Sequence, residues 1–282
     1  MPPLTADQFG LVQERLAKDP FRLLIAIQFL VRTPGKTSIP VFEDVMKRWP
    51  TPQDLAAANP DDIKGMIRKL GLCNQRCEAI QKYARMWCEQ PPDKDARYGV
   101  KDYPRKGDGK DVRAREVFGA EQELGQDTQT TEGPNHAGSE PTVTTKARGH
   151  GTAWEIGHLT FGRYAIDSWR IFCRDVLLGR AEDWKGAGRG PTFQPEWMRV
   201  LPEDKELRAY LRWMWMKEGW WWDPHTGDRT LLNNTMVQAV NEGCVAWDGE
   251  GELQIVDTPV RNGVVNSHAG GSVQQAGAAN GS

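Results

Sequence analysis

Apolar residues recur at helical spacing through the first third of the chain, and no segment alternates in the manner of a strand. The run PFRLLIAIQFLV, residues 20–31, is apolar nearly all round, which indicates a central buried helix. Thr51-Pro52 and Asn59-Pro60 each place a capping residue before a proline, so each predicts the start of a short helix. The pattern favours an all-helical fold.

Further helices are expected from start signals at Thr5, Ser38 and Asn74, and from periodic apolar positions over 165–178 and after Asp204. Helices of this kind bury one face against their neighbours, as in a compact helical domain.

Two stretches interrupt the helical pattern. Residues 98–150 are rich in Gly, Asp, Thr, Glu and Lys, and residues 179–195 are rich in glycine, so both are expected to be disordered insertions. The last part of the chain, residues 223–282, is acidic and then rich in Gly, Ala, Asn and Ser, which predicts a disordered tail. We therefore expect one helical domain over residues 1–222.

Charge and cysteine content narrow the class of protein. The net charge is −2, but residues 219–282 hold two basic against seven acidic side chains, so the helical part is mildly basic. This excess gives weak support to a DNA partner. The five cysteines form neither a paired framework nor a Cys/His set at metal-ligand spacing, and no apolar run reaches membrane-spanning length. We expect a soluble intracellular protein without a metal.

Two features carry candidate chemistry. The turn Leu159-Thr160-Phe161-Gly162 lies between two expected helices, where backbone N–H groups at a helix N-terminus can bind an anion. The same spacing also fits an ordinary helix connection. Asp204 precedes an amphipathic run, so its carboxylate fits either the N-cap of a helix or a catalytic group at the mouth of a site.

Three blocks of the chain occur in a characteristic order. They are FGLVQERLAKDPFRLLIAIQFLVRTPGKTSIPV at 9–41, continued to Leu70-Gly71-Leu72 and Arg76, then FGRYAIDSWRIFC at 161–173 and EWMRVLPEDKELRAYLRWMW at 196–215. Together they resemble the glycosylase domain of the methyl-CpG-binding thymine DNA glycosylase family, within the helix-hairpin-helix DNA glycosylase superfamily. The resemblance covers most of residues 9–90 and 154–218, and the family's methyl-CpG-binding domain has no counterpart in this sequence.

The resemblance implies a helix-hairpin-helix fold with two helical lobes and the active site in the cleft between them. It implies a monomeric enzyme that cleaves the N-glycosidic bond of thymine or uracil in G·T or G·U mismatches of double-stranded DNA. A stacked base cannot be reached, so the base must be flipped out, and a mismatched base costs least to unpair. By its place in the family motif, Asp204 stabilises the oxocarbenium-like sugar and orients the water. The substrate implies a nuclear location.

The resemblance also assigns residues around the base. Tyr164 stands where strand-cleaving relatives hold a lysine, and a phenol forms no Schiff base, so the implied enzyme is monofunctional. Tyr164 would line the base pocket, and Gln13 would bind the pyrimidine edge through its amide. From the pattern by itself, Tyr164 fits a core aromatic and Gln13 a solvated helix position. Glu203 is expected to point away from the sugar, and Asp167 to make a surface or capping interaction.

Arg32 and Leu72 correspond to the family's wedge residues, which fill the space that a flipped base leaves in the duplex. Each lies at a turn after a helix, where a side chain can project. The alternatives are that Arg32 caps the C-terminus of the buried helix and that Leu72 covers the core.

The hairpin residues Leu159, Phe161, Gly162 and Arg163 would hold a DNA phosphate. The family's first hairpin glycine is Thr160 here, which would be strained if it required a positive φ. The cysteines lack the tight cluster of iron–sulfur relatives, so no cofactor is expected. The alternative to an enzyme is a catalytically silent DNA-binding module, against which the intact surroundings of Asp204 weigh.

Overall fold

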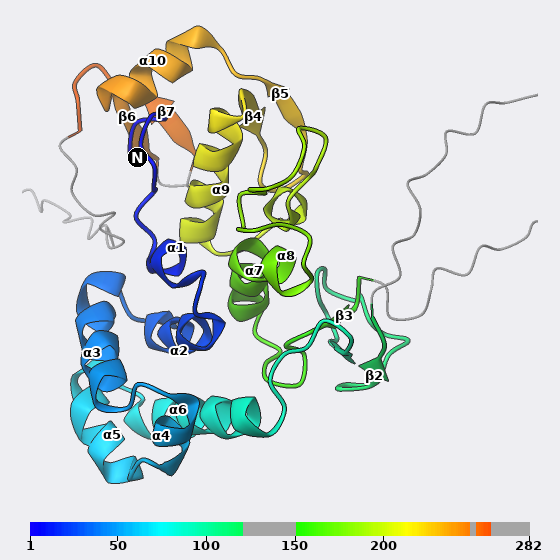
Figure 1. Ribbon diagram of the computed structural model, residues 1–282. Coiled ribbons are helices and arrows are strands. Elements are labelled where there is room, and N and C mark those ends of the chain that lie inside the picture. Colours follow the sequence, from blue (N-terminus) through cyan, green and yellow to red (C-terminus); the bar gives the residue numbers. More distant parts are fainter. Residues whose placement is uncertain (121–150, 249–251, 261–282) are drawn as a thin grey trace, which may run out of the picture. The chain divides into compact units, whose positions relative to one another are not determined.

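The computed structural model describes residues 1–120, 151–248 and 252–260, which belong to two compact units (Figure 1). The larger unit is Gln8–Leu231, and the smaller one joins Met1–Asp7 to the chain from Leu232 onward. The larger unit thus ends past residue 222, where we expected the helical domain to end. Among the described residues, none of the helices combines the length and the apolar surface that a membrane span requires.

The larger unit is mainly helical, as the apolar pattern predicts. In chain order its helices are α1 (Val12–Leu16), α2 (Pro20–Leu30), α3 (Gly35–Arg48), α4 (Pro52–Ala57), α5 (Pro60–Ile67), the 3-10 helix η1 (Arg68–Leu70), α6 (Cys73–Glu89), α7 (Arg163–Phe172), α8 (Arg174–Leu177), the 3-10 helix η2 (Glu196–Arg199) and α9 (Lys205–Lys217).

Helix α2 is the buried centre that its all-round apolar sequence predicts. It begins at Pro20, and the Asp19 side chain accepts a hydrogen bond from a backbone N–H of its first turn. The predicted starts of α4 and α5 are also confirmed, with Thr51 and Asn59 as the capping side chains. The helix expected from Ser38 instead begins three residues earlier, so its proline lies inside α3.

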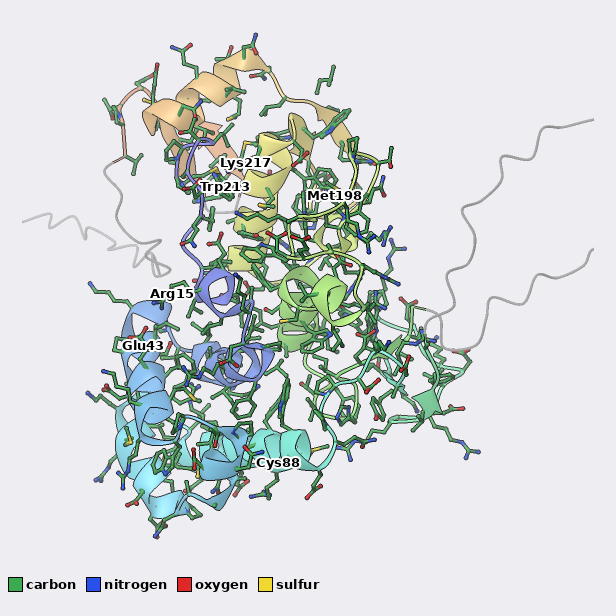
Figure 2. The ribbon with its side chains drawn as sticks, in the orientation of Figure 1. Arg15, Glu43, Cys88, Met198, Trp213 and Lys217 are labelled. Atoms are coloured by element: carbon green, nitrogen blue, oxygen red, sulfur yellow. The ribbon has the colours of Figure 1, made fainter. Side chains whose placement is uncertain are left out.

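The first helix begins later than its start signal at Thr5 predicts. Glu14 of α1 accepts hydrogen bonds from the backbone N–H groups of the three residues before the helix, at 2.7–3.0 Å. This carboxylate and the left-handed Gly10 (φ 108°) hold the preceding segment in a turn. An ion pair between Arg15 and Glu43, at 3.1 Å, then joins α1 to α3 (Figure 2).

Strands are present in the described residues, so the expectation of a fold without strands is wrong. The first sheet has the order β2-β1-β3 and is antiparallel, with β1 at Arg97–Gly99, β2 at Val117–Phe118 and β3 at Ala153–Trp154. It is built partly from residues 98–120, which we expected to be disordered. These residues bury Tyr98, Val100 and Tyr103, and that apolar surface supports a small ordered module. Residues 121–150 lie outside the described part.

The second expected insertion, residues 179–195, is also ordered. The Asp183 carboxylate accepts from the N–H groups of Lys185 and Ala187, both at 2.9 Å, and the Arg189 guanidinium donates to the carbonyl of Gly179 at 2.8 Å. These polar contacts close the loop on itself, which its glycine content does not reveal.

The chain after residue 218 is ordered further than expected. In the larger unit, β4 (Trp220–Trp222) pairs with β5 (Arg229–Leu231), and β4 packs against α9. In the smaller unit, α10 (Asn234–Glu242) precedes the antiparallel strands β6 (Val245–Trp247) and β7 (Leu253–Ile255). There, the N–H of Leu4 donates to Asn241 Oδ1 at 2.8 Å. Residues 249–251 and 261–282 of the expected tail lie outside the described part.

Candidate active site

Asp204 is the N-cap of α9. Its Oδ1 accepts hydrogen bonds from the N–H groups of Glu206 and Leu207, at 2.9 and 3.0 Å. Its Oδ2 has no hydrogen-bond partner among the described residues, and the side chain is half-buried. One oxygen therefore holds the start of the helix and leaves the other for chemistry, so the capping role is observed and is compatible with a catalytic one.

Tyr164, in the first turn of α7, lies close to Asp204. Burial raises the pKa of the Tyr164 phenol, and the negative charges of Asp204 and Glu206 raise it further. Gln13 of α1 donates from Nε2 to the phenol oxygen at 2.8 Å, and its side chain is buried rather than solvated. The structure thus brings together three residues that are far apart in the sequence, namely Gln13, Tyr164 and Asp204.

Glu206 is a neighbour of this group that the sequence does not single out. Although Glu206 is exposed, partial loss of hydration raises the pKa of its carboxyl, and the charge of Asp204 raises it as well. The sequence could have indicated that Glu206 lies near this group, because it comes two residues after Asp204 at the start of a helix.

The two expected wedge residues share an unusual backbone conformation. Arg32 (φ 55°) and Leu72 (φ 50°) both lie in the left-handed region, which is unfavourable for residues other than glycine. Arg32 is exposed, and the Leu72 residue is 48% exposed. Leu72 therefore does not cover the core. Strained residues of this kind persist where the surrounding structure holds them, often at functional sites.

Arg76 holds both of these turns. Its guanidinium donates to the carbonyl oxygens of Gln28, Phe29 (3.1 Å), Val31 (2.8 Å) and Gly71 (3.2 Å) and to Thr33 Oγ1 (2.6 Å). It caps the C-terminus of α2, the role that the sequence left open for Arg32. A signal was available, because Arg76 lies one helical turn before Ile80 on the buried face of α6, where a charged residue is unusual.

The hairpin turn differs from its expected form. The helix expected before it is a run of turns, in which Gly157 lies so close to the Tyr98 carbonyl of β1 that a side chain would collide. Thr160 is not among the described residues with positive φ, so it carries none of the strain considered for it. Its hydroxyl accepts from the N–H of Gly162 at 3.0 Å. Leu159 is buried, and Phe161 is exposed.

Arg163, expected to bind phosphate, is turned toward protein groups. Its guanidinium donates to the carbonyls of Asp102 and Pro104, at 2.9 and 2.6 Å, and pairs with the Glu203 carboxylate at 3.0 Å. Two of these partners lie in the inserted segment, which the sequence pattern does not connect to the hairpin. The ion pair holds Glu203, the neighbour of Asp204, against the hairpin helix.

Asp167 is buried, so the surface or capping interaction expected for it is wrong. Its Oδ1 accepts from the Tyr103 hydroxyl at 2.6 Å, and Arg170 donates to the same hydroxyl at 3.1 Å and to Glu196 at 2.6 Å. Burial raises the pKa of Asp167 to about 6, although the hydrogen bond from Tyr103 and the charge of Arg170 lower it. For Glu196, burial is outweighed by Arg170 and Arg174, which hold its pKa below the ordinary value.

We expect Asp167→Asn to change the pH dependence of stability. The folded pKa of about 6 lies above the ordinary 3.8. The contribution of Asp167 to the free energy of unfolding is therefore fully present below pH 3.8 and is lost as the pH rises through about 6. Asparagine keeps the acceptor for Tyr103 and cannot ionise. Above pH 6 the variant should therefore gain about 2–3 kcal/mol relative to wild type, measured by urea unfolding over a pH series. If the free energy of unfolding of Asp167→Asn followed the same pH dependence as that of wild type, this prediction would be contradicted. Asp61→Asn, at an exposed position, is the control.

A sequence model of the HhH-GPD superfamily, described as base excision DNA repair proteins, matches residues 30–268 of the chain. The chain belongs to the HhH-GPD superfamily. The resemblance noted in the sequence is thereby confirmed at the level of the superfamily. In the part of the chain that the structure describes, no group of three His, Cys, Asp or Glu side chains could hold a metal ion.

Two curated relatives of this HhH-GPD protein carry glycosylase names, and a third carries an endonuclease name. It is 32% identical to a thymine-DNA glycosylase of Aeropyrum pernix over 25% of the chain and 32% of the relative. It is 31% identical to a thymine/uracil-DNA glycosylase of Pyrobaculum aerophilum over 33% of the chain and 42% of the relative. It is also 32% identical to an endonuclease III of Thermotoga maritima over 26% of the chain and 34% of the relative. The matches span about a third to two fifths of each relative.

Proposed function

We propose that this HhH-GPD protein is a monofunctional DNA N-glycosylase that acts as a monomer on double-stranded DNA and removes thymine or uracil opposite guanine. Superfamily membership and the printed names of two relatives support this proposal. The observation that carries it is the Asp204 carboxylate, bound through one oxygen at the start of α9 beside Tyr164 and with its other oxygen unengaged within the described residues.

In the proposed reaction the mismatched nucleotide leaves the duplex and its sugar faces Oδ2 of Asp204. The bond between the sugar C1′ and the base nitrogen breaks, its electron pair leaves with the base, and the base takes up a proton. The carboxylate stabilises the positive sugar and orients a water molecule, which adds to C1′ and loses a proton to give an abasic site. Gln13, which donates to the Tyr164 phenol, offers its amide to the pyrimidine edge.

The test is base release from duplexes that carry one G·T or G·U pair. The proposal expects free thymine or uracil, and strand breaks only after alkali, because Tyr164 has no amine with which to cleave the strand. Strand breaks without alkali would contradict the monofunctional mechanism. Mismatch binding without base release would leave a silent DNA-binding module.

We expect Leu72→Gly to lower the rate of base release without lowering the stability of the fold. Glycine relieves the strained φ of 50°, so the free energy of unfolding should stay unchanged or rise by about 1 kcal/mol. Loss of the wedge should lower single-turnover base release by about tenfold or more, because no side chain then fills the space that the flipped base leaves in the duplex. Leu72→Ala is the matched control, since it removes the wedge and keeps the strain. A glycine variant with full activity would contradict the wedge role.

A further inference from the structure

The described part of the insertion carries a group of exposed cations. In the insertion loop, residues 101–116, the exposed basic side chains are Lys101, Arg105, Lys106, Lys110, Arg113 and Arg115. None of these six makes an ion pair with a carboxylate of the described residues. The loop holds these six basic side chains against four acidic ones, so it carries a net positive charge, and its cations are not held in ion pairs with described carboxylates.

Carboxylates of the same loop are bound to its own backbone. Asp102 accepts from the N–H of Gly107 at 2.8 Å, and Asp108 from the N–H of Arg105 at 2.9 Å. Glu116 accepts from the N–H of Arg113 at 2.8 Å. The carboxylates thus stabilise the turns, while the basic side chains remain at the surface.

The insertion loop is fastened to the hairpin. Arg163 binds two of its carbonyl groups, and its Tyr103 hydroxyl bonds Asp167 of the hairpin helix α7. The guanidinium of Arg115 lies over the exposed ring of Phe161, 5.6 Å from the ring centroid. A guanidinium stacked on a ring keeps N–H donors at its edge, and these match the oxygens of a phosphate.

We propose that Arg115, with Arg113 beside it, binds the phosphate backbone of duplex DNA next to the hairpin. Arg163 is engaged by the insertion loop, and Arg115 supplies a cation at the hairpin in its place. The occupant is double-stranded DNA, because its backbone complements the exposed cations and the surface is continuous with the hairpin. This inference rests on the proposed function only in requiring that the protein binds DNA.

The test measures binding of the full chain to a fluorescein-labelled duplex without a mismatch, across a salt series. Arg113→Gln with Arg115→Gln should raise Kd on the order of tenfold and lower the slope of log Kd against log salt by about 2. Arg115→Lys should restore part of the affinity of Arg115→Gln because it retains the charge.

Lys47→Gln is the control, because it removes one exposed charge from α3. An unchanged salt slope in the double variant, or an equal change in the slope with Lys47→Gln, would overturn the inference. Thermal unfolding checks that the variants fold as wild type does. A wild-type protein that binds this undamaged duplex but releases no base from G·T or G·U duplexes would refute the glycosylase proposal and leave this inference standing.

Discussion

Asp204→Asn is expected to abolish most base release while the fold stays intact. The asparagine keeps Oδ1, which accepts from the N–H groups of Glu206 and Leu207, and asparagine is a favoured N-cap residue. An NH2 group replaces Oδ2, and the negative charge is lost. Without it the positive sugar loses its stabiliser and the water its acceptor, so single-turnover base release from a G·U duplex should fall by about 10²–10⁴-fold.

The control variant for Asp204→Asn is at the residue next to it. Glu203→Gln alters the neighbouring carboxylate, which pairs with Arg163, and should retain most of the activity. Urea unfolding should place Asp204→Asn within about 0.5 kcal/mol of wild type, and mismatch binding should persist. Full activity in Asp204→Asn would remove this residue from the mechanism, whereas loss of binding together with activity would indicate a structural role.

Arg76→Gln is expected to destabilise the protein by about 3–5 kcal/mol, because several buried or partly buried carbonyl groups lose their donor together. Urea unfolding measures this change. Arg85→Gln, at an exposed position of the same helix, should cost less than about 0.5 kcal/mol. Equal effects of the two substitutions would show that the contacts of Arg76 contribute little.

Arg76→Lys tests whether the same side chain positions the wedge turns. Lysine keeps the charge but cannot reach both turns with one ammonium group. Amide hydrogen exchange should therefore rise together in residues 31–33 and 71–72, and base release should fall by about tenfold. Faster exchange in only one turn would show that Arg76 does not couple them. Unchanged base release despite looser turns would show that their fixed geometry is unnecessary.

Local signals predicted the helices that depend on local contacts. The apolar run from Pro20, and the caps Thr51 and Asn59, each specify a helix through neighbours a few residues away, and the structure agrees. The capping role left open for Asp204 is likewise local and is observed. Its catalytic role, and the wedge roles of Arg32 and Leu72, came from the order of the sequence blocks and stay predictions.

The sequence did not predict contacts in which a polar side chain binds a segment far along the chain. Asp167 has the sequence surroundings of a surface residue, yet Tyr103 lies against it and buries it. The bonds from Arg163 to the carbonyls of Asp102 and Pro104 were not predicted either, while its phosphate contact stays a prediction. Low complexity suggested disorder for the segment that supplies these partners, because composition does not show that a few apolar side chains there share a core.

The sequence by itself determined the helical character, the central helix α2 and the blocks that place the chain in its superfamily. Only the tertiary structure decided that Gln13 meets Tyr164, that Arg76 joins two turns and that the insertion occupies Arg163. The physical reason is the separation along the chain over which each kind of interaction acts. Helix propensity and capping act over one or two turns, whereas a buried donor binds whichever acceptor the folded chain brings within about 3 Å.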